Sequence, residues 1–356
     1  MNTVIHYPFG ALTLESKIRA KRIFKTDIKT GLCSRNILDL CRGMEVLKSI
    51  PYIERIEHSA HCHYSTCFCM LIEKAAGIEC SNDLNMVRTV LLEKERIFSH
   101  VTYLHRMFAL ADNYVLKNMA EYLINRCLDE LEEITGSRTY STSNTIGGLN
   151  YNFSVGNYMY SALTNNEIKS VLAKIKTLTN DSTAIRSQYG DLCRIKSVDK
   201  KFTGPFSWAL PNGFDLRITD TYLSYDRQEV SEALSKKQIY DPSFSYGRIM
   251  NIIEDSICSC NIIDGIFSAE KKEIRAKNNS DINVPGGKYA QSIESPRGKM
   301  EIEVELDDNG TVKEIKISSP SEKNMIMALE AMKHSPADDI QKAFESLYIS
   351  AMEIDR

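Results

Sequence analysis

The feature that most constrains the fold is an apolar pattern with helical spacing between residues 83 and 134. Apolar residues recur there every three or four positions, which is typical of an amphipathic helix. Because the pattern is longer than an ordinary globular helix, we expect two helices with a break near residues 109–113. Further periodic runs lie at 34–48, 58–78, 159–188 and 246–269. The sequence therefore predicts a multihelical core.

Strands are predicted at both ends of the chain. Residues 1–30 alternate weakly between apolar and polar positions, which favours short strands. Residues 300–306 and 312–317 alternate apolar and charged side chains, and the Asp-Asp-Asn-Gly sequence at 307–310 between them is a strong hairpin turn. We therefore expect a β-hairpin near the C-terminus.

The remaining segments complete the expected organisation, a mainly α fold of the α+β class. Residues 190–245 are rich in Gly, Pro and Tyr and predict an irregular loop, and a last helix is expected at about 322–347. The predicted parts are an N-terminal strand region (1–30), a helical core (31–270), an exposed connection (271–290), and a hairpin with a C-terminal helix that closes the active cleft (291–356).

Composition excludes several classes of protein. The chain of 356 residues is 43% hydrophobic and 26% charged, which is typical of a globular protein. A net charge of −3 gives no reason to expect a nucleic-acid partner. No apolar run approaches the roughly 20 residues that cross a bilayer, and the first residues do not resemble a signal peptide. We therefore expect a cytoplasmic location.

The cysteine pattern favours buried thiols over a metal site. The chain has ten cysteines and no C-x-x-C pair. The closest spacings are Cys67/Cys69 and Cys258/Cys260, and alternate residues of a helix point to different faces. We interpret these cysteines as small, reduced, buried apolar residues.

A series of short motifs in a fixed order carries a resemblance to a known family. The motifs are Arg42-Gly43-Met44-Glu45, Arg55-Ile56-Glu57-His58, Arg88 with Glu93, Arg96 and His100, Thr203-Gly204-Pro205 with Asp215-Leu216-Arg217, Glu294-Ser295-Pro296-Arg297-Gly298, Ser319-Pro320-Ser321 with Asn324, and Glu353-Ile354-Asp355-Arg356. Together they resemble the family shared by nickel–iron hydrogenase large subunits and the D-type subunit of NADH–quinone oxidoreductase.

The chain departs from the hydrogenase pattern at every nickel ligand. In hydrogenases two C-x-x-C pairs hold the nickel, and the resemblance places Glu57, Ala60, Ser350 and Glu353 at those four positions. A site of carboxylates does not suit a thiolate-bound nickel–iron centre. The resemblance therefore implies a member of the energy-converting hydrogenase-related type that binds no nickel and is not an active hydrogenase.

The same resemblance indicates candidate site residues. The D-type subunit presents a tyrosine to its quinone directly after the Arg-Ile-acid motif, and here that position is His58, which is able to donate a proton. His6 and Tyr64 are the other candidates for binding an acceptor. Glu57, His58 and Glu353 are expected to form a proton relay near Arg55. Alternatively, the two acids only pair with arginines such as Arg55 and tie the C-terminus into the core.

Two functions remain open at this point. The resemblance implies the core subunit of a membrane-associated, complex I-like oxidoreductase, linked to NAD(P)H or ferredoxin, that passes electrons to quinone or another acceptor with coupled ion movement. Its expected partners are an iron–sulfur small subunit and membrane ion-translocating subunits, with no cofactor bound by this chain itself and a peripheral position on the inner face of the cell membrane. The alternative is a non-catalytic structural or conformational-coupling subunit.

Overall fold

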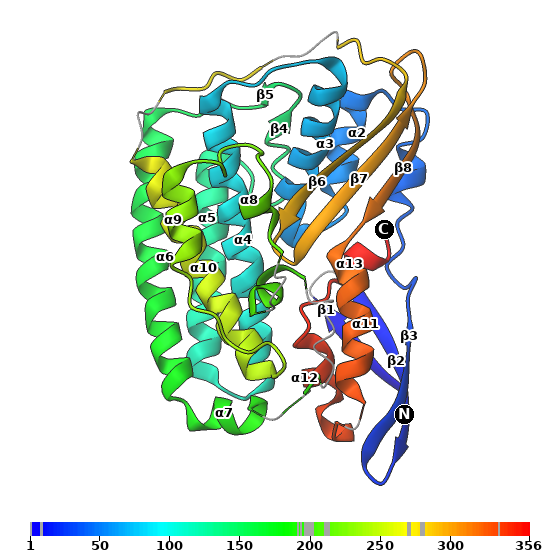
Figure 1. The fold of residues 1–356 in the computed structure, drawn as a ribbon, viewed down its shortest axis with the longest axis vertical. Helices are drawn as coiled ribbons and strands as arrows, with labels where there is room; N and C mark the ends of the chain where they lie inside the picture. The colour runs from blue at the N-terminus through cyan, green and yellow to red at the C-terminus, as the bar shows by residue number, and fades with distance from the viewer. Residues whose placement is uncertain are drawn as a thin grey trace.

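A helical bundle with two three-stranded antiparallel sheets beside it, and a further two-stranded sheet, forms the described part of the protein (Figure 1). The computed structural model describes residues 2–7, 10–190, 192, 194–195, 203–209, 214–268, 272–277, 282–333 and 335–356. The predicted α+β class, with strands at the N-terminus and a hairpin with helices at the C-terminus, is confirmed.

Four long helices form the bundle. They are α4 (Asn82–Leu110), α5 (Tyr114–Thr135), α6 (Val155–Asp181) and α10 (Ser245–Phe267), and Figure 1 shows them side by side. The predicted break between the first two is confirmed, because Asp112 has a φ of 55° and the side chain of Asn113 accepts a hydrogen bond from the Leu116 N–H at 3.1 Å. These local signals end one helix and begin the next.

Two three-stranded sheets flank the bundle. The N-terminal sheet has the order β1 (Asn2–Tyr7), β2 (Gly10–Arg19), β3 (Arg22–Lys29), and the C-terminal sheet has the order β6 (Gly287–Ser295), β7 (Gly298–Leu306), β8 (Val312–Ser318). The predicted hairpin is β7–β8, and its turn is held by the Asp307 carboxylate, which accepts hydrogen bonds from the Asn309 and Thr311 N–H groups at 2.9 Å.

Three predictions about irregular segments need correction. The exposed connection expected over 271–290 is too long by four residues, because strand β6 begins at Gly287. Residues 271 and 278–281 lie outside the described part. The loop expected over 190–245 contains η2 (Gly204–Ala209), α8 (Leu216–Thr219) and α9 (Gln228–Ser235). The helix expected at 322–347 is divided into α11 (Pro320–Met332), η3 (Ala337–Asp339) and α12 (Ile340–Glu345), because Pro336 cannot continue a helix.

The shorter elements position the candidate site. They are α1 (Ile37–Leu40), α2 (Val46–Glu54), η1 (His58–Ala60), α3 (His61–Ala76), β4 (Asn144–Thr145), β5 (Gly148–Leu149), α7 (Thr183–Tyr189) and α13 (Ala351–Ile354). Helix α3 contacts both α2 and β6, and thereby joins the bundle to the C-terminal sheet.

One apolar core runs through all of these elements. It includes Ile5 and Leu12 of the N-terminal sheet, Ile252 of the bundle, Ile302 of the C-terminal sheet and Phe344 of α12, each fully buried. Every cysteine of the closely spaced pairs is a buried free thiol, as the sequence predicts. Among the described helices, none is long and apolar enough to cross a membrane.

Candidate functional site

Three segments that are distant in the sequence meet where the resemblance places the nickel of hydrogenases. Glu57 lies at the N-cap of η1, and its carboxylate accepts hydrogen bonds from the Ser59 N–H at 3.1 Å and from the Ser59 hydroxyl at 2.7 Å. Glu353 lies in α13, the last helix. Arg297 lies in the tight turn between β6 and β7. The structure thus brings the two predicted acids into one cluster.

Arg297 is the counter-ion of both carboxylates. Its Nη2 lies 3.5 Å from Glu57 Oε1, and its Nη1 lies 3.6 Å from Glu353 Oε1. Nη2 also donates a hydrogen bond to the Ser59 hydroxyl at 2.8 Å, and the guanidinium lies over the Tyr348 ring at 4.8 Å from its centroid. All five residues are buried. We name Glu57, Arg297 and Glu353 the carboxylate–arginine triad.

The two acids of the triad differ in protonation. Burial acts to raise the pKa of Glu57, but Arg297 and the hydroxyls of Ser350 and Ser59 outweigh it and hold that pKa below its usual value. Burial raises the pKa of Glu353 above its usual value, because Arg297 and Ser321 compensate it incompletely. The triad therefore combines one ionised carboxylate with a carboxyl group that binds a proton more readily.

Serine hydroxyls join the C-terminal segment to the acids. The Ser350 hydroxyl donates to Glu57, and the Ser321 hydroxyl donates to Glu353. The Ser321 oxygen in turn accepts a hydrogen bond from the Ser350 N–H at 3.0 Å. Oxygen Oε1 of Glu353 is buried without a hydrogen-bond partner among the described residues. This carboxyl group retains hydrogen-bonding capacity toward its surroundings.

Backbone contacts fix the turn that carries Arg297. The Thr203 hydroxyl donates to the Arg297 carbonyl at 2.9 Å, and Gly204 approaches the same peptide so closely that a Cβ there would lie 2.6 Å from the Arg297 carbonyl carbon. Gly204 has a φ of 56°, which favours glycine. The Arg96 guanidinium donates to the carbonyls of Glu294 and Ser295 at 2.6 and 2.8 Å. Several motifs of the resemblance therefore meet here and position one arginine.

A cavity of about 300 Å³ opens beside the triad. Glu57, Arg297 and Ser350 line it together with His58 and Tyr348, and most of the remaining wall is apolar. This volume is at the lower end of small-molecule sites, which are typically concave and apolar with a few placed polar groups. We name it the acceptor cavity.

His58 lies between the acceptor cavity and a second, smaller one. It lines both, and its ring meets Phe98 and Tyr140 edge-on, with centroids 5.8 and 5.4 Å apart. Burial lowers the pKa of His58 to about 4, against the opposing effect of Glu57. The imidazole is therefore neutral at physiological pH and has one N–H that donates a hydrogen bond and one ring nitrogen that accepts one.

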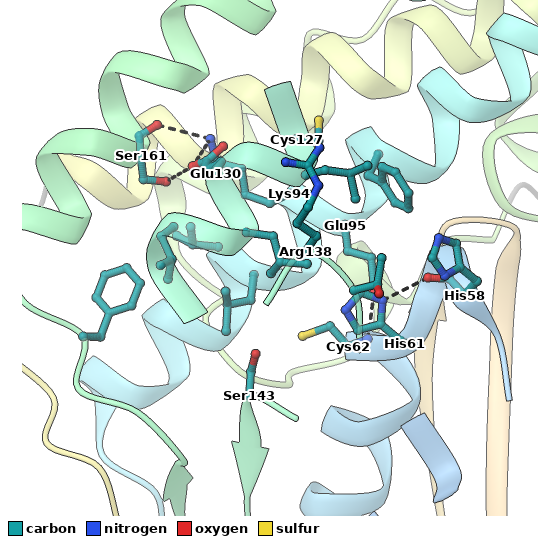
Figure 2. A pocket seen from close by; sticks show the side chains of 18 residues that line it. His58, His61, Cys62, Lys94, Glu95, Cys127, Glu130, Arg138, Ser143 and Ser161 are labelled. Carbon is teal, nitrogen blue, oxygen red and sulfur yellow. Dashed lines mark hydrogen bonds and ion pairs between the residues drawn. The ribbon is translucent and has the colours of Figure 1, made fainter. Parts of the chain in front are cut away.

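Figure 2 shows the second cavity, which has a volume of about 40 Å³. His61 and Glu95 lie at the same end as His58, and the Lys94–Glu130 ion pair lies at the other end. The sequence predicts none of these four residues as part of the site. Their contacts join α3, α4 and α5, and contacts between separate helices leave no local pattern in the sequence. We name this space the lateral cavity.

The remaining predicted site residues lie elsewhere. Tyr64 is buried and lines neither cavity, although Glu353 and Glu57 add to the effect of burial in raising its pKa. The backbone of His6 lies in β1 opposite Ala11, and its side chain lies outside the described residues.

The expectation that Arg55 pairs with the acids is wrong. Arg55 is exposed at the end of α2, where its Nη1 donates to the Pro51 carbonyl at 2.6 Å and its guanidinium lies over the Tyr140 ring. It turns outward because α2 ends at Glu54 and the chain reverses into η1. Arg297 takes the expected role, and the only sequence signal for it is its place in the Glu-x-Pro-Arg-Gly motif.

The donor set does not fit a nickel–iron centre. None of the four positions that hold nickel in hydrogenases is a thiolate here, and the Arg297 cation is paired with the two carboxylates. In the part of the chain that the structure describes, no group of three or more His, Cys, Asp or Glu side chains is placed to hold a metal ion.

Comparison with known proteins identifies the family. The family described as respiratory-chain NADH dehydrogenase, 49 Kd subunit, matches residues 123–280 and 271–356, which is more than half of the chain. The chain belongs to this family. The resemblance seen in the sequence is thereby confirmed.

Individual relatives are distant but extend over most of the chain. The D-type subunit of NADH-quinone oxidoreductase from Desulfotalea psychrophila is 23% identical over 363 residues, covering 98% of this chain and 93% of the relative. The same subunit from Dehalococcoides mccartyi is 23% identical over 347 residues, covering 92% and 89%. The C/D-type subunit from Bacteroides fragilis is 23% identical over 313 residues, and this chain spans only 57% of its length.

A solved structure has the same fold. A chain of the membrane-bound sulfane sulfur reductase, described as an archaeal respiratory membrane complex, superposes with a TM-score of 0.87 over 97% of this chain and 94% of the other. The two sequences are 17% identical, so the likeness establishes the fold alone.

Proposed function

We propose that this chain is the core subunit of a membrane-associated, complex I-like oxidoreductase that works without nickel. In this proposal an iron–sulfur small subunit delivers electrons to an acceptor, a quinone or another compound, in the acceptor cavity. Membrane subunits move ions in response, and the chain lies peripherally on the cytoplasmic face. Family membership, together with relatives that are subunits of NADH-quinone oxidoreductases, supports this assignment.

The acceptor cavity beside the carboxylate–arginine triad is the observation that carries the proposal. Reduction of an acceptor such as a quinone adds electrons and protons, so a competent site needs positive charge for the anionic intermediate and nearby proton donors. Arg297 lines the cavity as a buried cation. In this proposal the neutral imidazole of His58, which lines the cavity, relays a proton to the acceptor, and Glu353, whose pKa is raised and which does not line the cavity itself, is a second source of protons.

The alternative is a triad that only ties the C-terminus into the core. The hydrogen bonds from Ser59 and Ser350 to Glu57, together with its pairing to Arg297, favour this alternative, because they satisfy the Glu57 carboxylate without any ligand. In that case the chain is a structural or conformational-coupling subunit of its complex.

Conservative substitutions in the assembled complex separate the two functions. Glu57→Gln and Glu353→Gln preserve shape and remove the proton-exchanging group, and Glu303→Gln on the exposed face of β7 is the matched control. The assay is reduction of decylubiquinone by the dithionite-reduced complex, with assembly followed on native gels. Turnover that falls by about 10²-fold or more in an assembled complex supports the proposed function. Full turnover in the double variant, or loss of assembly alone, contradicts it.

A further inference from the structure

The lateral cavity has ionisable groups at both of its ends, and the wall between them is mostly apolar but includes the side chain of Arg138 (Figure 2). His58, Phe98 and Leu128 border it and the acceptor cavity alike. Figure 2 shows His61 and Glu95 near His58, with Lys94 and Glu130 on the far side. The function proposed above uses none of these last four groups.

Glu95 binds two imidazoles and the start of helix α3. Its Oε1 accepts a hydrogen bond from the Cys62 N–H at 2.7 Å and lies 2.8 Å from His61 Nδ1. Its Oε2 accepts a hydrogen bond from the His63 N–H at 2.8 Å and lies 2.6 Å from His63 Nδ1. The two N–H groups are among those that a helix leaves free at its N-terminus, where negative charge is favourable. We name His61, Glu95 and His63 the imidazole–carboxylate cluster.

The cluster has unused hydrogen-bonding groups that are fully enclosed. Nε2 of His61 and Nε2 of His63 are buried and have no hydrogen-bond partner among the described residues. His61 is 3% exposed and His63 is not exposed at all. Buried polar atoms of this kind are usually satisfied by an ordered water. His61 also lines the lateral cavity, whose volume of about 40 Å³ has room for more than one water.

The surroundings favour a proton on His61. Burial acts to lower its pKa, but the Glu95 carboxylate, with a further contribution from Glu54, raises that pKa to about 9. The same cluster holds the pKa of Glu95 far below its usual value. The titratable and charged groups that face the cluster are Glu54 of α2, His58 of η1, Cys62 of α3, Glu93 and Arg96 of α4, and Tyr140, whose ring centroid lies 5.7 Å from that of His61.

The far end of the lateral cavity contains an ion pair. Lys94 Nζ lies 3.0 Å from Glu130 Oε1, and the Ser161 hydroxyl donates to the same oxygen at 2.6 Å. The side chain of Lys94 is 12% exposed, whereas that of Glu130 is 3% exposed. The pair therefore borders the cavity at a point where Lys94 reaches the solvent, and the exposed Arg138 side chain lines the cavity as well.

We propose that the lateral cavity is a water-filled proton route from the Lys94–Glu130 pair through the imidazole–carboxylate cluster to His58 at the acceptor cavity. This inference rests on the proposed function. As the N–H bond of neutral His58 breaks and its proton passes to the reduced acceptor, the N–H bond of protonated His61 breaks and a water passes that proton to the other ring nitrogen of His58, where a new N–H bond forms and keeps the ring neutral. Electrons come only from the iron–sulfur partner. A proton from the far end of the cavity then restores the imidazolium of His61.

Filling the lateral cavity without changing its charged groups tests the route, because burial raises the pKa of the Cys127 thiol and keeps it neutral. Cys127 lines this cavity on α5, so Cys127→Leu narrows it, while Ala120→Leu on the same helix enlarges a buried residue that lines neither cavity and is the matched control. In the dithionite-reduced complex, Cys127→Leu should lower decylubiquinone turnover by about tenfold and increase the solvent isotope effect, because proton delivery becomes limiting. The KM for decylubiquinone and the reduction of ferricyanide, which takes no proton, should remain unchanged. Equal isotope effects in the two variants overturn the route.

Infrared spectroscopy tests the cluster independently of turnover. The difference spectrum between the native complex and the His61→Gln complex at pH 8 should contain an imidazolium band, and the Glu95→Gln complex should lack this band. A neutral His61 in the native complex at pH 8 overturns the proposal. If the complex reduces decylubiquinone normally and the cavity-filling variant behaves like its control, only the proton route fails. If Glu57→Gln and Glu353→Gln retain full turnover, the proposed function fails instead.

Discussion

Replacing Arg297 with Met should destabilise the protein strongly, and the loss should depend on pH. The substitution removes the cation that neutralises Glu57 and faces Glu353 while keeping an unbranched side chain about as long as the aliphatic part of arginine. At an effective dielectric constant of about 20, the contact with the ionised Glu57 carboxylate corresponds to about 5 kcal/mol of Coulomb energy at this separation. Part of that gain offsets the cost of burying the guanidinium. A net loss of about 3–5 kcal/mol is typical when one partner of a buried pair is removed.

The pH dependence follows from the pKa of Glu57. In the native protein this pKa is lowered, so the stabilisation is present above the unfolded value of about 4.3 and is lost as the pH falls through the folded value. Without Arg297 burial dominates, and the folded pKa of Glu57 rises above the unfolded value. The variant is therefore least stable at pH 8 relative to the native protein, and the difference becomes smaller as the pH falls and Glu57 of the variant takes up a proton.

Melting temperatures of the assembled complex provide the assay. For a chain of this size, a loss of 1 kcal/mol in stability lowers the melting temperature by about 2 °C. The Arg297→Met complex should therefore melt about 5–10 °C lower than the native complex at pH 8, and the decrease should be clearly smaller at pH 5. The triple variant that adds Glu57→Gln and Glu353→Gln removes the unpaired charges and should recover most of the loss. A decrease of less than about 2 °C at pH 8, or the same decrease at both pH values, would refute the reasoning.

Three further predictions follow from the sequence and the fold. Elemental analysis of the purified complex should find no stoichiometric nickel, because no thiolate occupies the four positions that hold it in hydrogenases. The chain expressed alone should self-associate in light scattering, since Val155, Met159 and Leu163 form an exposed apolar stripe on α6, and a stable monomer would contradict an obligate complex. Gly204→Ala should lower stability by about 2 kcal/mol or more, through strain and the clash with the Arg297 peptide, whereas Gly156→Ala in α6 should not be destabilising.

Local patterns predicted most of the fold correctly. The break between α4 and α5 and the turn of the β7–β8 hairpin depend on side chains within a few residues, such as Asn113 and Asp307. Strand β6 was missed because its first six residues are only partly buried or exposed, and its position depends on contacts with α3 and β7. Strand alternation is weak where burial on each face is incomplete.

The site was predicted less completely, because it also depends on contacts between segments that are distant in the sequence. Glu57 and Glu353 were placed together only through the resemblance, which aligns them with ligands of one metal. Arg297 is 240 residues from Glu57, and no periodicity or spacing reports a contact at that separation. The imidazole–carboxylate cluster joins two helices, and its acid, Glu95, carries no motif of its own.

The long separation between the parts of the triad has a consequence for how the protein matures. Glu57 and Ser350 are 293 residues apart, so their hydrogen bond closes a loop that includes most of the chain. Contacts of this separation are slow to form, and a chain leaves the ribosome from its N-terminus. During synthesis the segment with Glu57 and His58 is therefore present long before Arg297 and Ser350, and its carboxylate remains hydrated until they arrive. The walls that α4 and α5 give to the acceptor cavity are made early, but the cavity closes only after the segment with Tyr348 and Ser350 has been made.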